Sequence, residues 1–590
     1  MEKRKVVMSG NEAIARGAWE AGLHVASAYP GTPSTEILEA LATYDEIDAQ
    51  WAPNEKVSLE YVFGASLGGA RCMASMKHVG VNVAMDPLMT IGYAGVNGGL
   101  VLISADDPNM FSSQNEQDNR NLAKFARMAL FEPASPQEAK EMMKTAFEVS
   151  ERFDLPSMVR GTTRLCHGQG VVTLGERQKV ELKPYVKNYE KYMMLPSVCR
   201  VRRVDLDERL AKLEEFAESY PLNRVVEGSK KIGIITSGVA SLHAQEALPD
   251  ASFLILGLTN PLPRKLIREF AATVEQLYVV EELDPFMENQ IKTMGIEVTG
   301  KDKITPFGEL RPEVVSHALV PGAKIEERAP EVKAPTRPPL FCPGCAHRPV
   351  FHMLSQLKAT VTGDIGCYSL GAYPPLSSMD MNLCMGASIG VAHGMEKALR
   401  SGGKPRGRIA GIIGDSTFLH SGITPLLDLI YNKGSVCVIL LDNSTTAMTG
   451  HQEHPGTGKD AKGHPAPAVD YTKLAHSLGL EKVLEVNPLH VKKLKATLKE
   501  ALDGDEPSLV IARAPCALIE RKRPTHYVVV DPEKCTACGV CLKIGCPAIE
   551  KDDDEKALVN DTLCVGCAVC TQLCKFNAMK LISREEAAKK

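Results

Sequence analysis

The chain has 590 residues, of which 44% are hydrophobic and 24% charged, with a formal net charge of −4. This length exceeds a single hydrophobic core and predicts several domains. The acidic balance disfavours a nucleic-acid partner, which needs a clustered basic surface, and no apolar run is long enough to cross a membrane. The first residues lack the apolar stretch of a secretion signal, so we expect a cytoplasmic protein.

Short apolar runs alternate with longer helical stretches over most of the chain. Val81–Ala84 and Leu100–Ser104 are predicted strands, and Ser135–Phe153 is a predicted helix. Such alternation is typical of βα units, and it predicts doubly wound α/β domains built on mostly parallel sheets. We expect the first of these domains over residues 1–165.

The middle of the chain divides into a connecting segment and a smaller domain. Apolar residues at helical spacing, from Leu206 to Phe216, predict an amphipathic helix in a connecting segment over 166–229. A small α/β domain is expected over 230–323, with strands at Ile232–Thr236, Phe253–Leu256 and Leu277–Val280. A Pro-rich, charged stretch then predicts an extended linker over 324–340, before a third α/β domain over 341–520.

The last 66 residues, 525–590, are rich in cysteine. Their two motifs are Cys535-x2-Cys538-x2-Cys541-x4-Cys546 and Cys564-x2-Cys567-x2-Cys570-x3-Cys574. The second motif has the spacing of bacterial two-cluster ferredoxins, in which the fourth cysteine binds the other cluster, and the first has one extra residue. We therefore expect an α+β ferredoxin domain of the bacterial 2[4Fe–4S] type.

Crossed ligation assigns four cysteines to each cluster of this domain. One cluster is expected on Cys535, Cys538, Cys541 and Cys574, and the other on Cys546, Cys564, Cys567 and Cys570. A pair of zinc ribbons is the alternative, which two successive three-cysteine runs with a remote fourth cysteine disfavour. Between the motifs, the charged stretch Lys551–Lys556 predicts a solvated hairpin turn.

Two predicted strands of the third domain lead into oxygen-bearing residues. Ile409–Ile413 runs into Gly414-Asp415-Ser416, and Val436–Leu441 runs into Asp442-Asn443-Ser444-Thr445. Parallel strands bring their carboxyl ends together, where ligands bind in open α/β sheets. Mg²⁺ holding a diphosphate would take oxygen ligands there, for which we propose the Asp415 carboxylate, the Asn443 side chain and the Thr445 carbonyl. Two unrelated surface turns are the alternative.

This pair of loops resembles the Gly-Asp-Gly … Asn-Asn signature of thiamine-diphosphate enzymes, with Ser416 and Ser444 replacing the final Gly and the second Asn. The resemblance implies a diphosphate-binding-type thiamine domain over 341–520. It also implies a set of residues that bind thiamine diphosphate and Mg²⁺: Gly414, Asp415, Ser416, Asn443 and Thr445.

Three more segments, Cys342-Pro-Gly-Cys345, Gly363-Asp-Ile-Gly-Cys367 and Ala514-Pro-Cys516, resemble the ligands of the cluster nearest thiamine in 2-oxoacid:ferredoxin oxidoreductases. The resemblance implies a proximal [4Fe–4S] cluster on Cys342, Cys345, Cys367 and Cys516. A redox-active Cys-x-x-Cys pair and a buried structural thiol at Cys516 are the alternatives. Five further cysteines lack ligand spacing and are interpreted as structural thiols: Cys72, Cys166, Cys199, Cys384 and Cys437.

Two segments of the first domain also resemble this family. Tyr29–Glu36 is similar to the Tyr-Pro-x-Thr-Pro segment of its pyrimidine-binding domain, which implies that Thr32 faces the substrate. Glu55 precedes Gly64-Ala65 at the spacing of the family's catalytic glutamate, which implies that Glu55 hydrogen-bonds N1′ of the aminopyrimidine. Considered alone, Tyr29–Glu36 is a strand-to-helix turn, and Glu55 is an exposed residue at a helix start.

Segments in matching order along nearly the whole chain resemble the large (alpha) subunit of indolepyruvate:ferredoxin oxidoreductases. They are Tyr29–Glu36, Asp106–Arg120, Cys342–Arg348, Gly363–Leu370, Cys384–Gly390, Gly414–Gly422 and Asp442–Gln452. This resemblance implies oxidative decarboxylation of arylpyruvates with coenzyme A to aryl-acetyl-CoA and CO₂. Electrons would pass through three [4Fe–4S] clusters to an external ferredoxin.

The same resemblance implies that residues 230–323 are like the C-terminal domain of transketolase. It further implies a smaller beta subunit, which supplies a γ-type domain, in an (αβ)₂ hetero-oligomer. The sequence leaves three alternatives open. These are an oxidoreductase for another 2-oxo acid such as pyruvate or a branched-chain acid, a non-oxidative thiamine decarboxylase, and an electron carrier with a degenerate thiamine fold.

Overall fold

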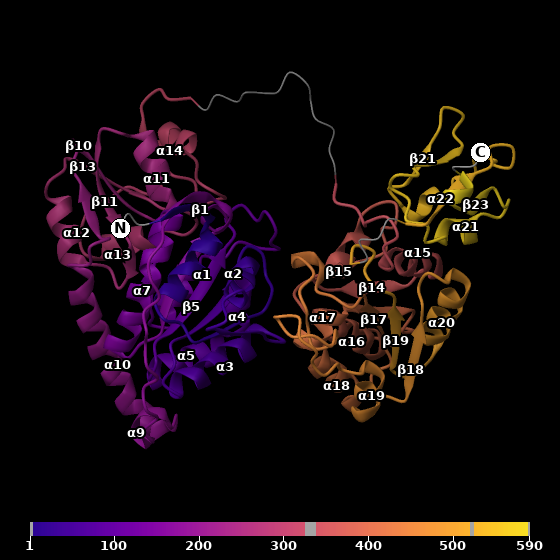
Figure 1. The fold of residues 1–590 in the computed structure, drawn as a ribbon, viewed down its shortest axis with the longest axis horizontal. Helices are drawn as coiled ribbons and strands as arrows, with labels where there is room; N and C mark the ends of the chain where they lie inside the picture. Colours follow the sequence, from indigo (N-terminus) through magenta and orange to yellow (C-terminus); the bar gives the residue numbers. More distant parts are fainter. Residues whose placement is uncertain (1–3, 325–337, 520–523, 588–590) are drawn as a thin grey trace. The chain divides into compact units, whose positions relative to one another are not determined.

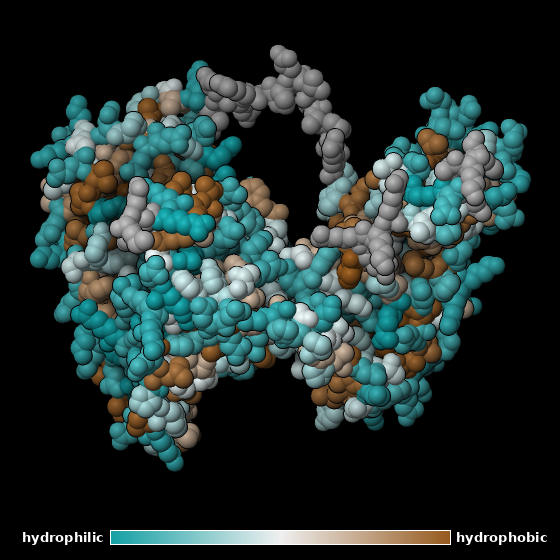
Figure 2. All heavy atoms as spheres, viewed as in Figure 1, coloured by the Kyte–Doolittle hydropathy of each residue, from teal (hydrophilic) through white to brown (hydrophobic). Residues whose placement is uncertain are grey.

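The computed structural model describes residues 4–324, 338–519 and 524–587, in two compact units, Met1–Glu331 and Val332–Lys590. Figure 1 traces both units along the sequence, and Figure 2 shows that their visible surface is mainly hydrophilic. Within the described ranges, no helix combines the length and the apolar character that a membrane crossing requires. The predicted linker 324–340 lies mostly outside the described residues.

The first unit is built on a sheet of seven described strands in the order β12-β6-β7-β5-β4-β2-β3, in which only β12 is antiparallel to its neighbour. The strands are β2 Val25–Ala28, β3 Asp48–Trp51, β4 Cys72–Lys77, β5 Leu100–Asp106, β6 Ala129–Phe131, β7 Ser157–Thr162 and β12 Leu258–Asn260. Buried side chains pack on both faces, as in doubly wound sheets.

Helices connect and cover these strands. They are α1 Gly10–Glu20, α2 Thr35–Ala42, α3 Glu55–Leu67, α4 His78–Val83, α5 Met85–Ala94, α6 Asn119–Phe125, α7 Pro136–Phe153 and α8 Thr163–His167. The predicted helix Ser135–Phe153 is confirmed as α7, with Ser135 as its N-cap. The predicted strand Val81–Ala84 is wrong, because this run lies at the end of α4 and the start of α5. A short apolar run does not distinguish a buried strand from a buried helix.

The rest of the first unit contains a long helix and a smaller sheet. Strands β1 Lys5–Ser9 and β8 Gln169–Thr173 pair antiparallel, and α9 Tyr189–Tyr192 and α10 Pro196–Ala217 follow. The small sheet has the order β13-β10-β11-β9, with β9 Arg224–Val226, β10 Ser229–Ser237, β11 Ala251–Leu256 and β13 Gln276–Val280. Its helices are α11 Gly238–Ala247, α12 Arg264–Ala271, α13 Phe286–Thr293 and α14 Pro312–Leu319. The amphipathic helix and the three strands predicted here are confirmed.

A buried charge network joins the large sheet of the first unit to the end of β13. Arg120 is 1% exposed and donates hydrogen bonds to Asp118 at 2.8 Å, to the Glu281 carboxylate at 2.8 Å and to the Glu282 carbonyl at 2.6 Å. Burial raises the pKa of Glu282 to about 7. A buried charge is tolerated only when it is paired. Arg120 therefore holds the large sheet and the end of β13 together.

The second unit is built on a parallel sheet of six described strands in the order β15-β14-β16-β17-β19-β18. The strands are β14 Thr360–Gly363, β15 Met381–Asn382, β16 Ile409–Gly414, β17 Cys437–Asp442, β18 Lys482–Val486 and β19 Ser508–Arg513. Alternate residues face two cores: Ile412 and Ile439 pack on one side, and Ile413 and Leu440 on the other. Both central strands, β16 and β17, occur where the sequence predicts them.

The helices of this unit include α15 His347–Leu357, α16 Ala387–Ser401, α17 Asp415–Thr417, α18 Ile423–Tyr431, α19 Tyr471–Ser477 and α20 Val491–Asp503. The C-terminal segment pairs β20 His526–Val530 with β23 Met579–Ser583, and β21 Ile549–Lys551 with β22 Ala557–Val559, both antiparallel. The predicted hairpin around Lys551–Lys556 is therefore confirmed. Helices α21 Val569–Leu573 and α22 Arg584–Ala587 complete the segment, and its apolar residues share one core with α15.

Candidate functional site

One edge of the six-stranded sheet gathers most of the predicted site residues of the second unit. The parallel neighbours β14, β16, β17 and β19 lead into Cys367, Asp415, Asn443 and Cys516 respectively. The backbone N–H of Cys516 donates to the carbonyl of Asn443 at 3.0 Å. Residues predicted to bind a metal and a cysteine predicted to bind a cluster are thus joined through the backbone.

Oxygen atoms converge around Asp415, which is 3% exposed. The side-chain oxygen of Asn443 lies 2.9 Å from the Thr445 carbonyl oxygen, and 3.1 and 3.3 Å from the two Asp415 carboxylate oxygens. An amide rotated by 180° would donate hydrogen bonds to these three oxygens. The structure thus brings together the three groups that the sequence predicts as ligands: the Asp415 carboxylate, the Asn443 side chain and the Thr445 carbonyl.

Backbone N–H groups hold the Asp415 carboxylate in place. Ser416 N–H donates to one carboxylate oxygen at 2.9 Å, and Ser444 N–H donates to the other at 2.7 Å. The second oxygen also lies 3.3 Å from Nε2 of His454, which is 6% exposed. Sequence reasoning missed His454, since it lies 39 positions beyond Asp415 and reaches the site through the long loop after β17.

The ring of Tyr368 lies between the loop that carries Cys367 and the loop that carries Asp415. A Cβ atom on Gly366 would lie 2.3 Å from the Tyr368 ring, and one on Gly414 would lie 2.8 Å from it. The Tyr368 hydroxyl donates to Asp364, whose other carboxylate oxygen accepts from Ser388 at 2.8 Å. Burial raises the pKa of Asp364 to about 7. Gly414 therefore leaves the space that the Tyr368 ring occupies. Tyr368 is a second residue that sequence reasoning missed.

The cysteines predicted for the proximal cluster lie close to one another. Cys342 and Cys345 form a turn just before α15, with a 3.1 Å backbone hydrogen bond between them. Burial raises the pKa of Cys367 to about 11, and the nearby Cys516 and Cys342 add to that rise. Burial likewise raises the pKa of Cys345 to about 12, with Cys367 and Cys342 adding to it. Each of the four thiols therefore lies near at least one of the others.

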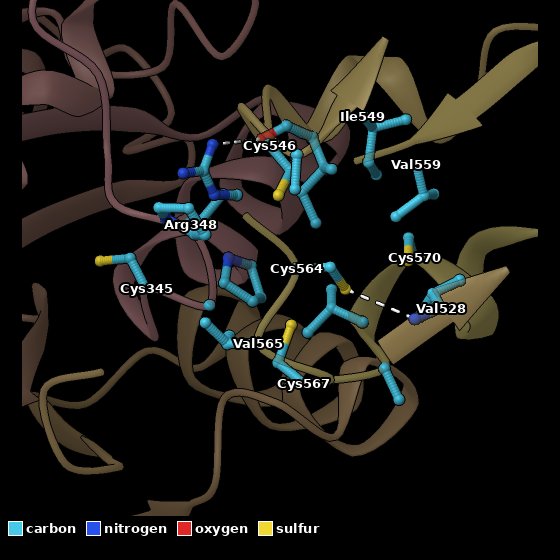
Figure 3. A pocket seen from close by; sticks show the side chains of 17 residues that line it. Cys345, Arg348, Val528, Cys546, Ile549, Val559, Cys564, Val565, Cys567 and Cys570 are labelled. Atoms are coloured by element: carbon cyan, nitrogen blue, oxygen red, sulfur yellow. Dashed lines mark hydrogen bonds between the residues drawn. The ribbon is translucent and has the colours of Figure 1, made fainter. Parts of the chain in front are cut away.

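The eight C-terminal cysteines line two separate hollows. Figure 3 shows the first, whose lining includes Cys546, Cys564, Cys567 and Cys570, with the hydrogen bond from Val528 N–H to Cys564 dashed. The lining of the second includes Cys535, Cys538, Cys541 and Cys574. Each hollow thus draws its fourth cysteine from the other motif, which is the grouping that crossed ligation predicts.

The two C-terminal cysteine groups line hollows. Among the described residues, no three His, Cys, Asp or Glu side chains come close enough to bind a single metal ion. Of the five cysteines interpreted as structural, Cys72, Cys166 and Cys437 are buried, whereas Cys384 is exposed.

In the first unit, Glu55 and Thr32 follow neighbouring strands of the large sheet. Glu55 is the first residue of α3, yet it is only 5% exposed, so it is not an exposed helix-start residue. A Cβ atom on Gly80 would lie 2.4 Å from its carboxylate, so Gly80 leaves the space that this carboxylate occupies. Thr32 is half-buried and forms a cis peptide bond with Pro33.

A buried lysine lies beside the Thr32 loop. Lys77 ends β4, and its Cβ lies 3.0 Å from the position a Cβ would take on Gly31. Its ammonium donates to the Ser112 carbonyl at 2.8 Å. Burial lowers the pKa of Lys77 to about 8, against the opposing effect of Asp107. Lys77 belongs to no recognisable sequence motif, so sequence reasoning missed it.

Family models match both units. Residues 16–205 match the thiamine-diphosphate-binding model of pyruvate flavodoxin/ferredoxin oxidoreductases, and residues 364–512 match the C-terminal TPP-binding domain of thiamine pyrophosphate enzymes. These two ranges overlap the two domains for which the sequence predicts thiamine binding. Fold and site together define a thiamine-diphosphate-binding protein of the 2-oxoacid:ferredoxin oxidoreductase superfamily.

Similar proteins of known name identify the family of this chain within the superfamily. The chain is 42% identical to indolepyruvate oxidoreductase subunit IorA of Archaeoglobus fulgidus, over 98% of each chain. It is 39% identical to the protein of that name from Pyrococcus abyssi, over 99% of this chain and 98% of the relative. The chain therefore belongs to the family of indolepyruvate oxidoreductase subunit IorA.

A solved structure is also similar, that of 2-oxoglutarate:ferredoxin oxidoreductase from Magnetococcus marinus. The identity is 19%, the TM-score is 0.46, and the match covers 53% of this chain and 64% of that one.

Replacing Gly414 by alanine tests the packing between the two loops of the second unit. We expect Gly414→Ala to lower the free energy of unfolding by about 1–3 kcal/mol, because the added methyl group overpacks against Tyr368. Urea denaturation under anaerobic conditions measures the change. Gly390→Ala in α16 is the control, since nothing lies within 4 Å of its added methyl group. An unfolding midpoint of Gly414→Ala equal to that of Gly390→Ala would contradict this account.

Proposed function

We propose that the chain catalyses the oxidative decarboxylation of arylpyruvates such as indolepyruvate. Coenzyme A is the co-substrate, aryl-acetyl-CoA and CO₂ are the products, and ferredoxin receives the electrons. The similarity to indolepyruvate oxidoreductases supports the aryl substrate. One observation carries the proposal most directly: the hydrogen bond from Cys516 N–H to the Asn443 carbonyl joins an oxygen-rich metal site to a group of four cysteines.

We assign the Mg²⁺ of the cofactor to Asp415, Asn443 and Thr445, whose converging oxygens fit a hard cation. Gly414 and Ser416 complete the binding loop, since one leaves space at the strand end and the other holds the Asp415 carboxylate. Thiamine diphosphate bound there supplies an electron sink for the bond that breaks when CO₂ leaves.

In the first unit we assign Glu55 and Thr32 to the reaction. A buried carboxylate at a helix start suits Glu55 to hold a proton at N1′ of the aminopyrimidine. Thr32 presents a hydroxyl from a half-buried loop, which suits contact with the 2-oxo acid. Lys77, beside this loop, adds a cationic group of the kind that attracts a substrate carboxylate.

We assign three [4Fe–4S] clusters to the three cysteine groups, where they would carry single electrons toward ferredoxin. The group of Cys342, Cys345, Cys367 and Cys516 is the one at the sheet edge. Cys345 also lines the hollow of Cys546, and a Cβ on Gly344 would lie 2.2 Å from Val565, between Cys564 and Cys567. We therefore propose that electrons pass next to the Cys546 group. The Cys535 group, which includes the exposed Cys538, is the last before ferredoxin.

We further propose a partner subunit. The word "subunit" in the names of the relatives supports an assembly of more than one chain, and the resemblance stated above assigns the γ-type domain to a smaller beta chain. An (αβ)₂ hetero-oligomer is the arrangement we propose, with external ferredoxin as a transient partner.

Anaerobic co-expression with the small subunit tests the activity. We expect ferredoxin reduction that requires coenzyme A, thiamine diphosphate and an arylpyruvate. Asp415→Ala is expected to lower kcat/KM by ~100-fold or more, since even outer partners of metal ligands contribute about 10- to 100-fold. Asp428→Ala, which removes a carboxylate that is 60% exposed on α18, is the matched control and should stay near the native rate.

The assay separates the open alternatives. Pyruvate or a branched-chain 2-oxo acid preferred over every arylpyruvate would contradict the substrate, and aldehyde release without ferredoxin reduction would indicate a non-oxidative decarboxylase. Absence of bound thiamine diphosphate and Mg²⁺ would indicate an electron carrier. A lone large chain active at the full rate would contradict the partner subunit.

Stepwise removal of cysteines tests crossed ligation. In a chain carrying Cys535→Ala and Cys538→Ala, which has lost one cluster, adding Cys574→Ala should remove no further iron. Adding Cys546→Ala instead should remove about four more iron atoms, because it reaches the other cluster. Iron and sulfide analysis of anaerobically purified protein measures both. The reverse pattern would show that each motif binds its own cluster.

A further inference from the structure

Arg348 lies between two of the cysteine groups and is buried, with 4% of its surface exposed. It is the second residue of α15 and follows Cys345 by three positions. Together with Cys345, Cys546, Cys564 and Cys567, it lines the hollow drawn in Figure 3. No part of the proposed function has used it so far.

The guanidinium bridges the backbones of two cluster-binding loops. One terminal nitrogen donates to the carbonyls of Ile544 and Gly545, directly before Cys546. The other donates to the carbonyls of Phe341 and Cys342, in the loop of the proximal group, at 2.9 Å for Cys342. Four of its five N–H groups are thereby satisfied, and Nε–H has no partner in the described residues.

The positive charge itself lacks a compensating carboxylate. Among the described residues, no Asp or Glu forms an ion pair with Arg348, whereas Arg71, Arg120 and Arg160 all do. Its place in the first turn of α15 adds to the cost, because the positive end of a helix disfavours a cation. Burial of an unpaired charge costs free energy. We therefore expect anions other than carboxylates to compensate the charge of Arg348.

The nearest candidates for those anions are the surrounding thiolates. Arg348 lines one hollow together with Cys345, Cys546 and Cys567, and it donates to the Cys342 carbonyl at 2.9 Å, so these four cysteines are its neighbours. Two belong to the proximal group and two to the Cys546 group. Four thiolates with a four-iron cube carry net negative charge in both oxidation states, and the reduced state is the more negative.

We propose that Arg348 is the shared counter-charge of the two neighbouring [4Fe–4S] clusters and raises both of their reduction potentials. The inference rests on the proposed function, in that it requires clusters on these cysteines. A fixed cation stabilises the reduced, more negative form of each cluster more than the oxidised form, and net charge is one of the factors that set such potentials. Arg348 is thus a positioning residue that acts on both clusters through its charge.

The test compares Arg348→Met with Arg348→Lys in the anaerobically purified full chain. Methionine keeps much of the side-chain length without charge, while lysine keeps the charge but loses the planar fork that bridges four carbonyls. Cluster potentials are measured by redox titration with EPR detection, and iron is counted in each variant. Arg408→Met is the matched control, because Arg408 is in the same unit and is paired with Asp503 at 2.7 Å.

We expect Arg348→Met to shift two of the three cluster potentials to more negative values, while the cluster of the Cys535 group keeps its potential. Arg348→Lys should stay near the native potentials, and Arg408→Met should leave all three unchanged. Arg348→Met could instead lose iron. In that case the proposal is supported if Arg348→Lys retains its iron and its native potentials.

Two outcomes would overturn the proposal. One is an Arg348→Met chain with full iron and unchanged potentials. The other is an Arg348→Lys chain that shifts or loses clusters as much as Arg348→Met, which would mean that the carbonyl bridges and not the charge are responsible. Absence of iron from the native chain would overturn both this proposal and the proposed clusters, so the two failures are distinguishable.

Discussion

Parallel strands end at one edge of their sheet, and the chemistry assigned to the second unit depends on this constraint. Strands β16 and β17 bring Asp415 and Asn443 together at that edge, although 28 positions separate them. Strands β14 and β19 bring Cys367 and Cys516 to the same edge. The sheet therefore places the proposed oxygen ligands of Mg²⁺ beside two of the proposed sulfur ligands of a cluster.

The second consequence concerns charge. Around Asp415 a buried carboxylate lies beside the Asn443 amide and the Thr445 carbonyl, while around Arg348 the buried group is a cation without an ion-paired carboxylate among the described residues. The two sites thus differ in the sign of their buried charge. Mg²⁺ completes the first in the proposed function, and iron–sulfur clusters complete the second. The sign of the buried charge thus agrees with the kind of cofactor proposed at each place.

Local sequence spacing made many of the candidate site residues predictable. The residues that were missed depend on long-range packing. The C-x2-C runs and the strand-plus-polar pattern around Asp415 depend on neighbours in sequence, so their residues could be named in advance. Tyr368, His454 and Arg348 act through side-chain contacts with distant segments, which no local pattern encodes. Val81–Ala84 was assigned wrongly as a strand because a buried helix and a buried strand are equally apolar over four residues.

The central claim is that electrons from a 2-oxo acid enter the cysteine groups at the sheet edge that holds Asp415. The most direct measurement is the EPR signal of reduced clusters in the anaerobic assembly, frozen after mixing with arylpyruvate and coenzyme A. We predict a reduced-cluster signal in the native protein and none in Asp415→Ala, although dithionite reduces the clusters of both. A substrate-driven signal of equal size in Asp415→Ala would contradict the account.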